Sequence, residues 1–162
     1  MRLIKTEYRN YYSPDDPGER GYDEVLPRYS VTDEEVEILS KLASGKNVLE
    51  IGTGLGVSTR ALAKTAIRVV SVDIDPWTHS FAFPSNVKLV KTIPDEHFEL
   101  VFIDGLHKFE SVVADIETCK GDLFVLHDCY LEGVALAIQY TALVEQQCFN
   151  TVCDMRSFRK KG

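Results

Sequence analysis

Short apolar runs alternate with amphipathic segments along most of the chain. The runs that have the length and composition of buried strands cover residues 47–51, 69–73, 87–90, 99–104 and 122–127. Between and around them, apolar residues recur at three- and four-residue intervals, as the buried face of a helix requires, over residues 33–43, 59–66, 107–119 and 131–147. A further strand is expected over residues 149–155.

This alternation predicts an α/β fold. We expect a Rossmann-like, doubly wound and mostly parallel sheet of six to seven strands, with helices on both faces. Ligands of such sheets bind outside the carboxyl ends of the strands, so polar residues at these ends are expected to converge. The residues in question are Glu50, Asp73, Asp104, His127 and Asp128. Glu99 and Asp122 begin strands and are excluded from the site.

The first 30 residues differ in composition from the rest. They hold five of the seven tyrosines, together with Pro14, Pro17 and Pro27, and such a segment does not support a long helix. Two interpretations remain open: an arm packed on the surface or on a second subunit, and a lid over a substrate. Residues 31–162 are expected to form a single domain.

Composition narrows the possible partners. The chain of 162 residues has 18 basic and 25 acidic side chains and a net charge of −7, which argues against nucleic acid as a partner. No apolar run approaches the ~20 residues that span a membrane, and the first residues do not resemble a signal peptide, so a cytoplasmic location is expected. The basic segment 156–161 is expected to be a solvated terminus.

The four cysteines form no C-x-x-C pair. In a cytosolic chain they are expected to be reduced and partly buried rather than a disulfide or zinc set. Cys129 is the one cysteine that stands next to a candidate site residue, Asp128.

A glycine-rich turn follows the strand over residues 47–51, in the pattern Glu50-x-Gly52-x-Gly54-x-Gly56. Glycines allow a ligand to approach the backbone closely. A phosphate-binding P-loop requires Gly-Lys-Ser/Thr, which is absent, and the dinucleotide pattern G-x-G-x-x-G requires glycine where the chain has Val57. Asp73 ends the next strand, where a carboxylate can accept hydrogen bonds from both hydroxyls of a ribose.

The glycine pattern and its preceding glutamate resemble the first motif of the class I S-adenosylmethionine-dependent methyltransferases. The segments 102–107 and 123–128 resemble the small-molecule, catechol-type O-methyltransferase branch, and the resemblance covers residues 31–158. It implies that Ile74 and Thr92 flank the ribose and adenine of S-adenosylmethionine and that Asp104 lies against the cofactor. The residues that it implies for the methionine and ribose parts are Glu50, Gly52, Thr53, Gly54, Gly56, Ser58 and Asp73.

The resemblance also implies a metal site. The family takes its metal ligands from the ends of the fourth and fifth strands, where this chain has Asp104, His127 and Asp128. Two carboxylates suit Mg²⁺ or Mn²⁺, and the imidazole shifts the preference towards Mn²⁺, Fe²⁺ or Zn²⁺. In the alternative, Asp104 only contacts the cofactor, Asp128 caps the following helix and His127 is a hydrogen-bonded core residue.

Three functions remain open. The first is methyl transfer to a small-molecule hydroxyl, with Asp104 and Asp128 as catalytic residues through the metal, or with His107 as a metal-independent base. The second is an N-methyltransferase with a macromolecular substrate. Residues 104–107 argue against it for nucleic acid, because they lack the Asp/Asn-Pro-Pro-aromatic motif of the methyltransferases that modify amino groups of nucleic acids. The third is a minimal module that binds S-adenosylmethionine without catalysis. Residues 92–98 are too few for the helix that the family usually has between the third and fourth strands, so the adenine pocket is poorly specified. A second subunit of a homodimer could complete the site.

Overall fold

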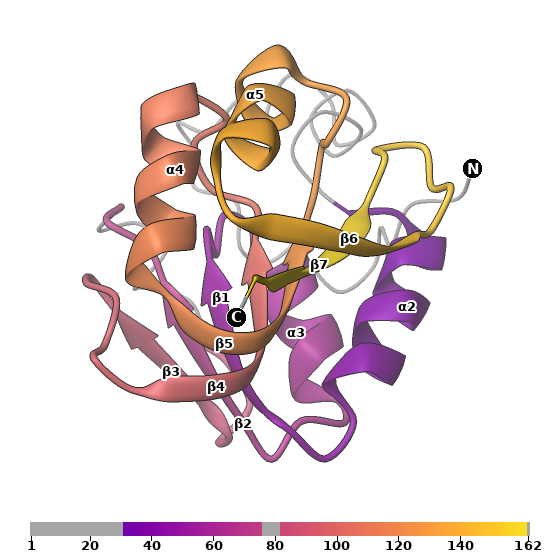
Figure 1. Ribbon diagram of the computed structural model, residues 1–162. Coiled ribbons are helices and arrows are strands. Elements are labelled where there is room, and N and C mark those ends of the chain that lie inside the picture. The colour runs from indigo at the N-terminus through magenta and orange to yellow at the C-terminus, as the bar shows by residue number, and fades with distance from the viewer. Residues whose placement is uncertain (1–30, 76–81, 162) are drawn as a thin grey trace, which may run out of the picture.

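One sheet of seven strands organises the part of the chain that the computed structural model describes, residues 31–75 and 82–161 (Figure 1). The strands are β1 (Asn47–Ile51), β2 (Arg68–Val72), β3 (Val87–Val90), β4 (His97–Ile103), β5 (Lys120–Leu126), β6 (Leu143–Cys148) and β7 (Arg156–Lys160). Their order is β3-β2-β1-β4-β5-β7-β6. The pairs among β1 to β5 are parallel, and β7 is antiparallel to both β5 and β6. The predicted fold class is confirmed.

Helices cover both faces of the sheet. The described helices are α2 (Asp33–Ala43), α3 (Val57–Ala63), α4 (Phe109–Thr118) and α5 (Glu132–Tyr140). Leu39 of α2 and Leu62 of α3 belong to one core cluster, whereas Ile116 of α4 and Ala137 of α5 belong to the other. Figure 1 shows the two pairs on opposite sides of the strands. The central strands are buried on both faces, which explains why their sequences are continuously apolar.

The start of α2 follows its sequence signal. The side chain of Thr32 accepts a hydrogen bond from the Glu35 amide (3.3 Å), and Glu35 Oε2 accepts one from the Thr32 amide (2.8 Å). This capping box satisfies two amides that the first turn of a helix leaves without partners. It also fixes the Glu35 side chain, which is completely buried.

The C-terminal third differs from the prediction. The helix expected to reach residue 147 ends at Tyr140, and residues 143–148 form β6. Because most side chains of β6 are exposed, the strand has no alternating pattern that would distinguish it from a helix. The strand expected over residues 149–155 is a loop in which Asn150 and Asp154 adopt left-handed φ values of 54° and 48°, which a strand cannot contain.

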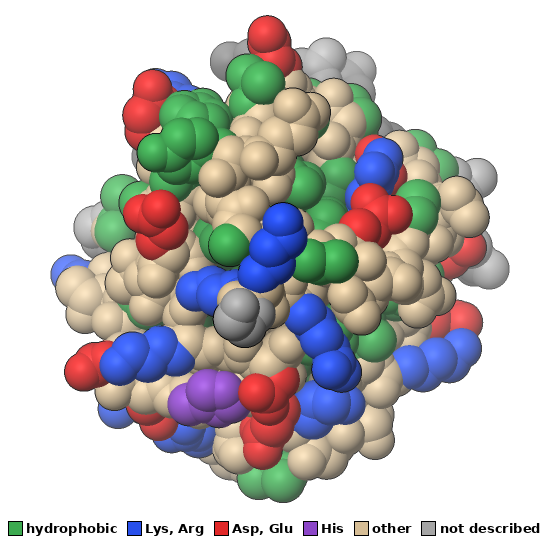
Figure 2. Space-filling model, in the orientation of Figure 1, with side chains coloured by type: hydrophobic (Ala, Val, Ile, Leu, Met, Phe, Trp, Pro, Cys, Tyr) green, Lys and Arg blue, Asp and Glu red, His purple; other side chains and the backbone are tan. Residues whose placement is uncertain are grey.

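The basic segment near the C-terminus is not the solvated tail that was expected. Residues 156–160 form β7, which lies between β5 and β6, and its Phe158 is only 1% exposed. Arg156 pairs with Asp154 and Glu145 at 2.7 and 3.1 Å, and Lys160 lies 5.0 Å over the ring of Phe124. Figure 2 shows Lys and Arg side chains beside Asp and Glu side chains on this face of the molecule, rather than a surface of one charge.

The predicted arm or lid over residues 1–30 lies outside the described residues. In the described part of the chain, no helix is long and apolar enough to cross a membrane.

Candidate functional site

The glycine turn, residues 52–56, joins the carboxyl end of β1 to α3 and packs against the end of β4. Gly52 has a φ of 92°, and a Cβ atom there would collide with the backbone carbonyl of Asp104. Gly54 has a φ of 50°, and no atom of the described residues lies within 4 Å of the position that its Cβ would take. The turn therefore requires glycine at position 52 for packing and leaves open space above position 54.

Glu50 lies beneath this turn rather than on its surface. Its carboxylate is fully buried and accepts hydrogen bonds from the hydroxyls of Ser58 (2.5 Å), Thr59 (2.6 Å) and Ser71 (2.5 Å). Burial raises the pKa of Glu50 to about 7 although these three hydroxyls lower it. Through these bonds Glu50 ties β1 to α3 and β2. The sequence analysis did not identify Thr59 and Ser71 as members of this network.

Asp73 follows the end of β2 and contacts the turn directly. Its Oδ2 accepts hydrogen bonds from the amides of Thr53 (3.1 Å) and Gly54 (3.0 Å), and its Oδ1 accepts one from the Asp75 amide (2.9 Å). The Thr53 hydroxyl is 2.6 Å from Ser71 Oγ. The end of β2 and the glycine turn thus form one hydrogen-bonded unit in which the Asp73 side chain is half-buried.

Ile74 and Thr92, which the resemblance implies beside the ribose and adenine, follow the ends of β2 and β3. Ile74 is 76% exposed, and Thr92 is exposed as well. Both residues lie at the edge of the sheet that carries Asp73, and neither side chain packs in the hydrophobic core. An exposed isoleucine next to a partly buried carboxylate offers an apolar surface beside a polar one.

Four side chains meet at the ends of β4 and β5 and form the acid–imidazole cluster: Asp104, His107, His127 and Asp128. Nδ1 of His127 lies 3.3 Å from Asp104 Oδ1 and 3.3 Å from Asp128 Oδ2. Nε2 of His107 lies 3.3 and 3.4 Å from the same two oxygens. Each carboxylate therefore lies between two imidazoles. From the sequence, His107 was predicted as a separate candidate base, whereas the structure brings it to the same carboxylate oxygens as His127.

The backbone at Asp128 explains how consecutive side chains reach one cluster. Neighbouring residues of a strand point to opposite faces. Asp128 lies just after β5 and has a left-handed φ of 53°, which is uncommon for a residue other than glycine and occurs at functional sites. Asp128 does not cap the next helix, because the N-cap of α5 is Leu131 and the helix has no side-chain cap. This part of the alternative interpretation is wrong.

Electrostatic interactions within the cluster are strong because it is largely removed from water. The His127 side chain is 4% exposed, and that of Asp104 is 19% exposed. Burial would raise the pKa of Asp104, but the adjacent charge of His127 and the hydrogen bond with His107 lower it overall. The hydrogen bond with Asp104 raises the pKa of His107. Burial lowers the pKa of His127, but the adjacent charge of Asp104 helps to raise it overall.

The cluster has the donors of a metal site. One ligand atom from each of Asp104, His127 and Asp128 lies within 4.8 Å of the other two. The two nitrogens of His127 are buried and have no hydrogen-bond partner among the described residues. Two carboxylates with one imidazole fit Mn²⁺, Fe²⁺ or Zn²⁺ better than Mg²⁺, which prefers oxygen ligands throughout. The residues present therefore fit a divalent cation.

Two further side chains next to His127 were missed as site residues. Glu35 was recognised only as a capping residue, yet its Oε2 is 3.3 Å from His127 Nε2. The relevant cysteine is not Cys129, which is buried with its thiol donating to the Leu126 carbonyl, but Cys153. Burial raises the pKa of the Cys129 thiol to about 12, as expected of an inert core cysteine. No pattern within the sequence relates Glu35 or Cys153 to residue 127.

The turn and the cluster are contiguous. Gly52 packs on the backbone of Asp104, and the side chain of Asp104 belongs to the acid–imidazole cluster. The glycine turn and the acid–imidazole cluster are therefore neighbours at the carboxyl edge of the sheet.

The fold is shared with methyltransferases of known structure. The cofactor-bound protein Rv0187 from MTB is similar with a TM-score of 0.67 and 23% identity over 90% of each chain. The O-methyltransferase from Bacillus cereus in complex with SAH gives a TM-score of 0.66 and 16% identity over 97% of each chain. The tRNA (m1A58) methyltransferase TrmI from Aquifex aeolicus gives 0.62 and 14% identity, over 83% of this chain and 71% of that chain.

No family model matches the chain, and a search of curated proteins finds no match. The similarity to these solved structures establishes the fold. Because they include both an O-methyltransferase and a tRNA methyltransferase, they do not favour one acceptor class.

Proposed function

We propose that the protein is an S-adenosylmethionine-dependent methyltransferase that methylates a hydroxyl oxygen of a small molecule. The observation that carries the proposal is the contact between Gly52 and the backbone of Asp104, which places the open glycine turn directly beside the acid–imidazole cluster. The fold shared with methyltransferases supports the donor, and the cluster supports the oxygen acceptor.

The turn residues have separate tasks in binding the cofactor. Asp73, which stands at the end of β2 against the turn, would accept hydrogen bonds from the ribose hydroxyls. Ile74 would cover an apolar part of the nucleoside. Glu50 and Ser58, which were also expected to bind the cofactor, would hold the turn in shape from below through their hydrogen bond.

The cluster would prepare the acceptor. S-adenosylmethionine supplies a methyl group on a positively charged sulfur; the acceptor oxygen forms the new bond to carbon as the carbon–sulfur bond breaks, and the hydroxyl proton has to leave. His107 is the most exposed member of the cluster, at 33%, and is placed to accept that proton. A divalent cation held by Asp104 and Asp128, with His127 as a third ligand when its Nδ1 carries no proton, would lower the pKa of the hydroxyl.

Two observations weigh against a nucleic-acid acceptor. The net charge is −7, and in the described residues the basic side chains of Arg156 and Lys160 already pair with neighbouring groups of the chain. Binding to a polyanion depends on cations that are free to contact phosphate. A small molecule is therefore the better candidate.

Transfer of a labelled methyl group tests the proposal. Purified protein, S-adenosylmethionine with a tritiated methyl group and Mn²⁺ are incubated with a metabolite extract, with total RNA or with protein. We expect label only in the small-molecule fraction, and a loss of more than about a hundredfold in Asp104→Asn. The matched control is Asp122→Asn, at the opposite edge of the sheet, which should retain full activity.

Other outcomes decide between the alternatives. Label in RNA or protein would contradict the small-molecule acceptor and favour a macromolecular one. Cofactor binding without transfer to any fraction would favour the module that binds S-adenosylmethionine without catalysis.

A further inference from the structure

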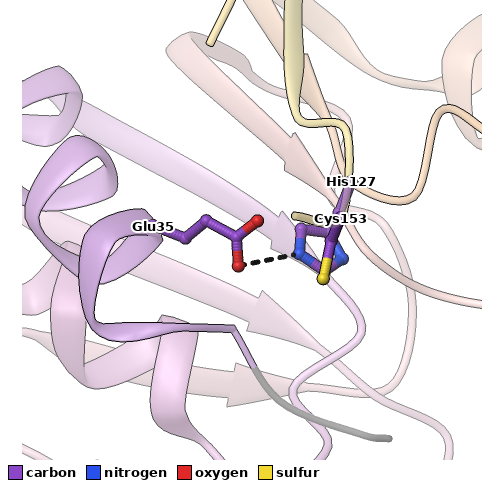
Figure 3. Close-up of side chains that lie close together, drawn as sticks. All are labelled: Glu35, His127 and Cys153. Atoms are coloured by element: carbon purple, nitrogen blue, oxygen red, sulfur yellow. Dashed lines mark ion pairs between the residues drawn. The ribbon is translucent and has the colours of Figure 1, made fainter. Parts of the chain in front are cut away.

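A second cluster lies on the side of His127 that faces away from Asp104 and Asp128. It consists of Glu35, His127 and Cys153, which come from α2, from the end of β5 and from the loop between β6 and β7 (Figure 3). In Figure 3 the Glu35 side chain extends from its helix towards the imidazole, and the Cys153 sulfur lies beside the ring. One ligand atom from each residue lies within 4.8 Å of the other two.

Two buried atoms on this side of His127 lack hydrogen-bond partners, although Glu35 Oε2 accepts a hydrogen bond from the Thr32 amide. Glu35 is 0% exposed and its Oε1 has no hydrogen-bond partner among the described residues; the same holds for Nε2 of His127, whose side chain is 4% exposed. A buried carboxylate oxygen and a buried imidazole nitrogen without partners cost free energy. A ligand that accepts electron pairs from both would remove that cost.

The spacing of these atoms fits a metal better than a hydrogen bond. Oε2 of Glu35 lies 3.3 Å from Nε2 of His127. A charge-assisted hydrogen bond between such groups is shorter, about 2.8 Å. Two ligand atoms that are each about 2.0 Å from a zinc ion, at a tetrahedral angle, lie about 3.3 Å apart.

We propose that Glu35, His127 and Cys153 bind a thiophilic divalent cation of the zinc class. A carboxylate oxygen, an imidazole nitrogen and a thiolate are the three donor types that Zn²⁺ takes in proteins, and the sulfur excludes Mg²⁺ and Ca²⁺ as the natural occupant. The glutamate and the thiolate together balance the charge of the ion. Cys153 is half-buried, which gives the ion a route of entry.

The same imidazole connects the two clusters. With the cation on Nε2, Nδ1 carries a proton and faces Asp104 Oδ1 and Asp128 Oδ2. A carboxylate commonly accepts the second N–H of a metal-bound histidine and fixes the orientation of its ring. Because a neutral imidazole has a single lone pair, a cation bound here removes His127 from the ligands of an ion between Asp104 and Asp128. The zinc-class site does not depend on the proposed methyl transfer.

Titration with Cd²⁺ tests the site, because a cadmium–thiolate bond gives a charge-transfer absorption band in the ultraviolet that oxygen and nitrogen ligands do not give. The full chain, stripped of metal and kept reduced with a phosphine, is titrated with Cd²⁺, and Zn²⁺ affinity follows from competition. We expect a band that saturates at one ion per chain. Cys153→Ser should abolish it, and Glu35→Gln should weaken Cd²⁺ binding by at least about a hundredfold.

Matched variants assign the band to this site. Cys148→Ser removes a half-buried cysteine at the end of β6 that lies outside the cluster, and it should leave the band unchanged. Asp104→Asn removes a carboxylate of the acid–imidazole cluster and should also retain the band. A band that persists in Cys153→Ser or disappears in Cys148→Ser would overturn the proposal, as would the absence of a band in the wild-type protein.

Thermal unfolding separates lost binding from lost folding. Zn²⁺ should raise the unfolding temperature of the wild-type protein and leave that of Cys153→Ser unchanged. Without metal the two proteins should unfold at similar temperatures, because a half-buried thiol and a hydroxyl differ little in packing. An equal increase with Zn²⁺ in both proteins would contradict the site.

Discussion

Glu50 is completely buried beneath the glycine turn, whereas Asp73 on the neighbouring strand is only half-buried and Asp104 faces two imidazoles. All three carboxylates follow the same sequence pattern, a polar residue at or near the carboxyl end of a parallel strand. Their surroundings give them different tasks. Three hydroxyls engage Glu50, backbone amides of the turn engage Asp73, and the histidines engage Asp104.

The buried Glu50 carboxyl predicts a pH dependence of stability. Burial raises its pKa from 4.5 to about 7, so the folded state holds a proton that the unfolded state releases at lower pH. Its contribution to the free energy of unfolding is fully present below pH 4.5 and is lost as the pH rises through about 7. Glu50→Gln removes this titration. The free energy of unfolding of the variant relative to that of the wild type should therefore rise by about 1–3 kcal/mol between pH 5 and pH 8.

Urea unfolding of both proteins across this pH range measures the effect. Glu34→Gln, on the exposed side of α2, is the control and should follow the wild-type profile. A constant difference between Glu50→Gln and wild type at all pH values would contradict the raised pKa.

Substitutions at two glycines of the turn should affect different properties: one should lower the stability of the fold, and the other should weaken ligand binding. Gly52→Ala places a Cβ against the Asp104 carbonyl at a φ of 92°, so we expect a loss of at least about 2 kcal/mol in the free energy of unfolding. In Gly54→Ala the new methyl group meets no atom in the described part of the chain, and the φ of 50° costs only about 1 kcal/mol, but the methyl group occupies the space offered to a ligand.

Thermal unfolding and S-adenosylhomocysteine binding, measured on both variants, test this pair. Gly54→Ala should fold and bind the nucleoside at least about tenfold more weakly than wild type. Unchanged affinity in Gly54→Ala would show that the ligand does not approach the turn.

At the scale of elements, β7 joins the C-terminal residues to the core. Phe158 pairs in register with Phe124 of β5 and is buried among the residues of α4 and α5. Phe158→Ala should therefore lower the free energy of unfolding by about 3–5 kcal/mol. Arg159→Ala, an exposed neighbour in the same strand, should change it by less than about 1 kcal/mol. Equal and small effects in urea unfolding would mean that residues 156–160 are a solvated tail.

The sequence predicted the elements that carry a continuous buried apolar run or a capping signal. β1, β2, β4 and β5 each contain a buried apolar run because helices cover both faces of the sheet there. The start of α2 was predictable from the capping box at Thr32. β6 and β7 were missed because β6 is mostly exposed and β7 is rich in basic residues, so neither has the apolar pattern of a strand.

Part of the candidate site could be predicted from the sequence and part of it could not. Residues at the strand ends followed from the topology of the sheet, which brings Asp104, His127 and Asp128 together. Glu35 and Cys153 come from a helix and a loop that are distant in sequence, and only the packing of α2 and of residues 149–155 places them beside His127.

At the scale of the whole molecule, the carboxyl edge of the sheet combines a nucleotide-type turn with a group of acids and imidazoles. The amino edge carries carboxylates as well, but Asp122 there pairs with His97 on an exposed surface, with side-chain exposures of 62% and 57%. The direction of the parallel strands therefore separates a candidate site from an ordinary charged surface. Asp122 serves as the matched control for this reason.

Calorimetric titration with S-adenosylhomocysteine tests the central claim most directly, because the product binds without being consumed. We predict that the wild-type chain binds one molecule, that Asp73→Ala weakens binding by about tenfold or more through the lost ribose hydrogen bonds, and that Asp122→Ala binds as the wild type does. Absence of binding to the folded wild-type protein, or equal affinity in Asp73→Ala, would contradict the account.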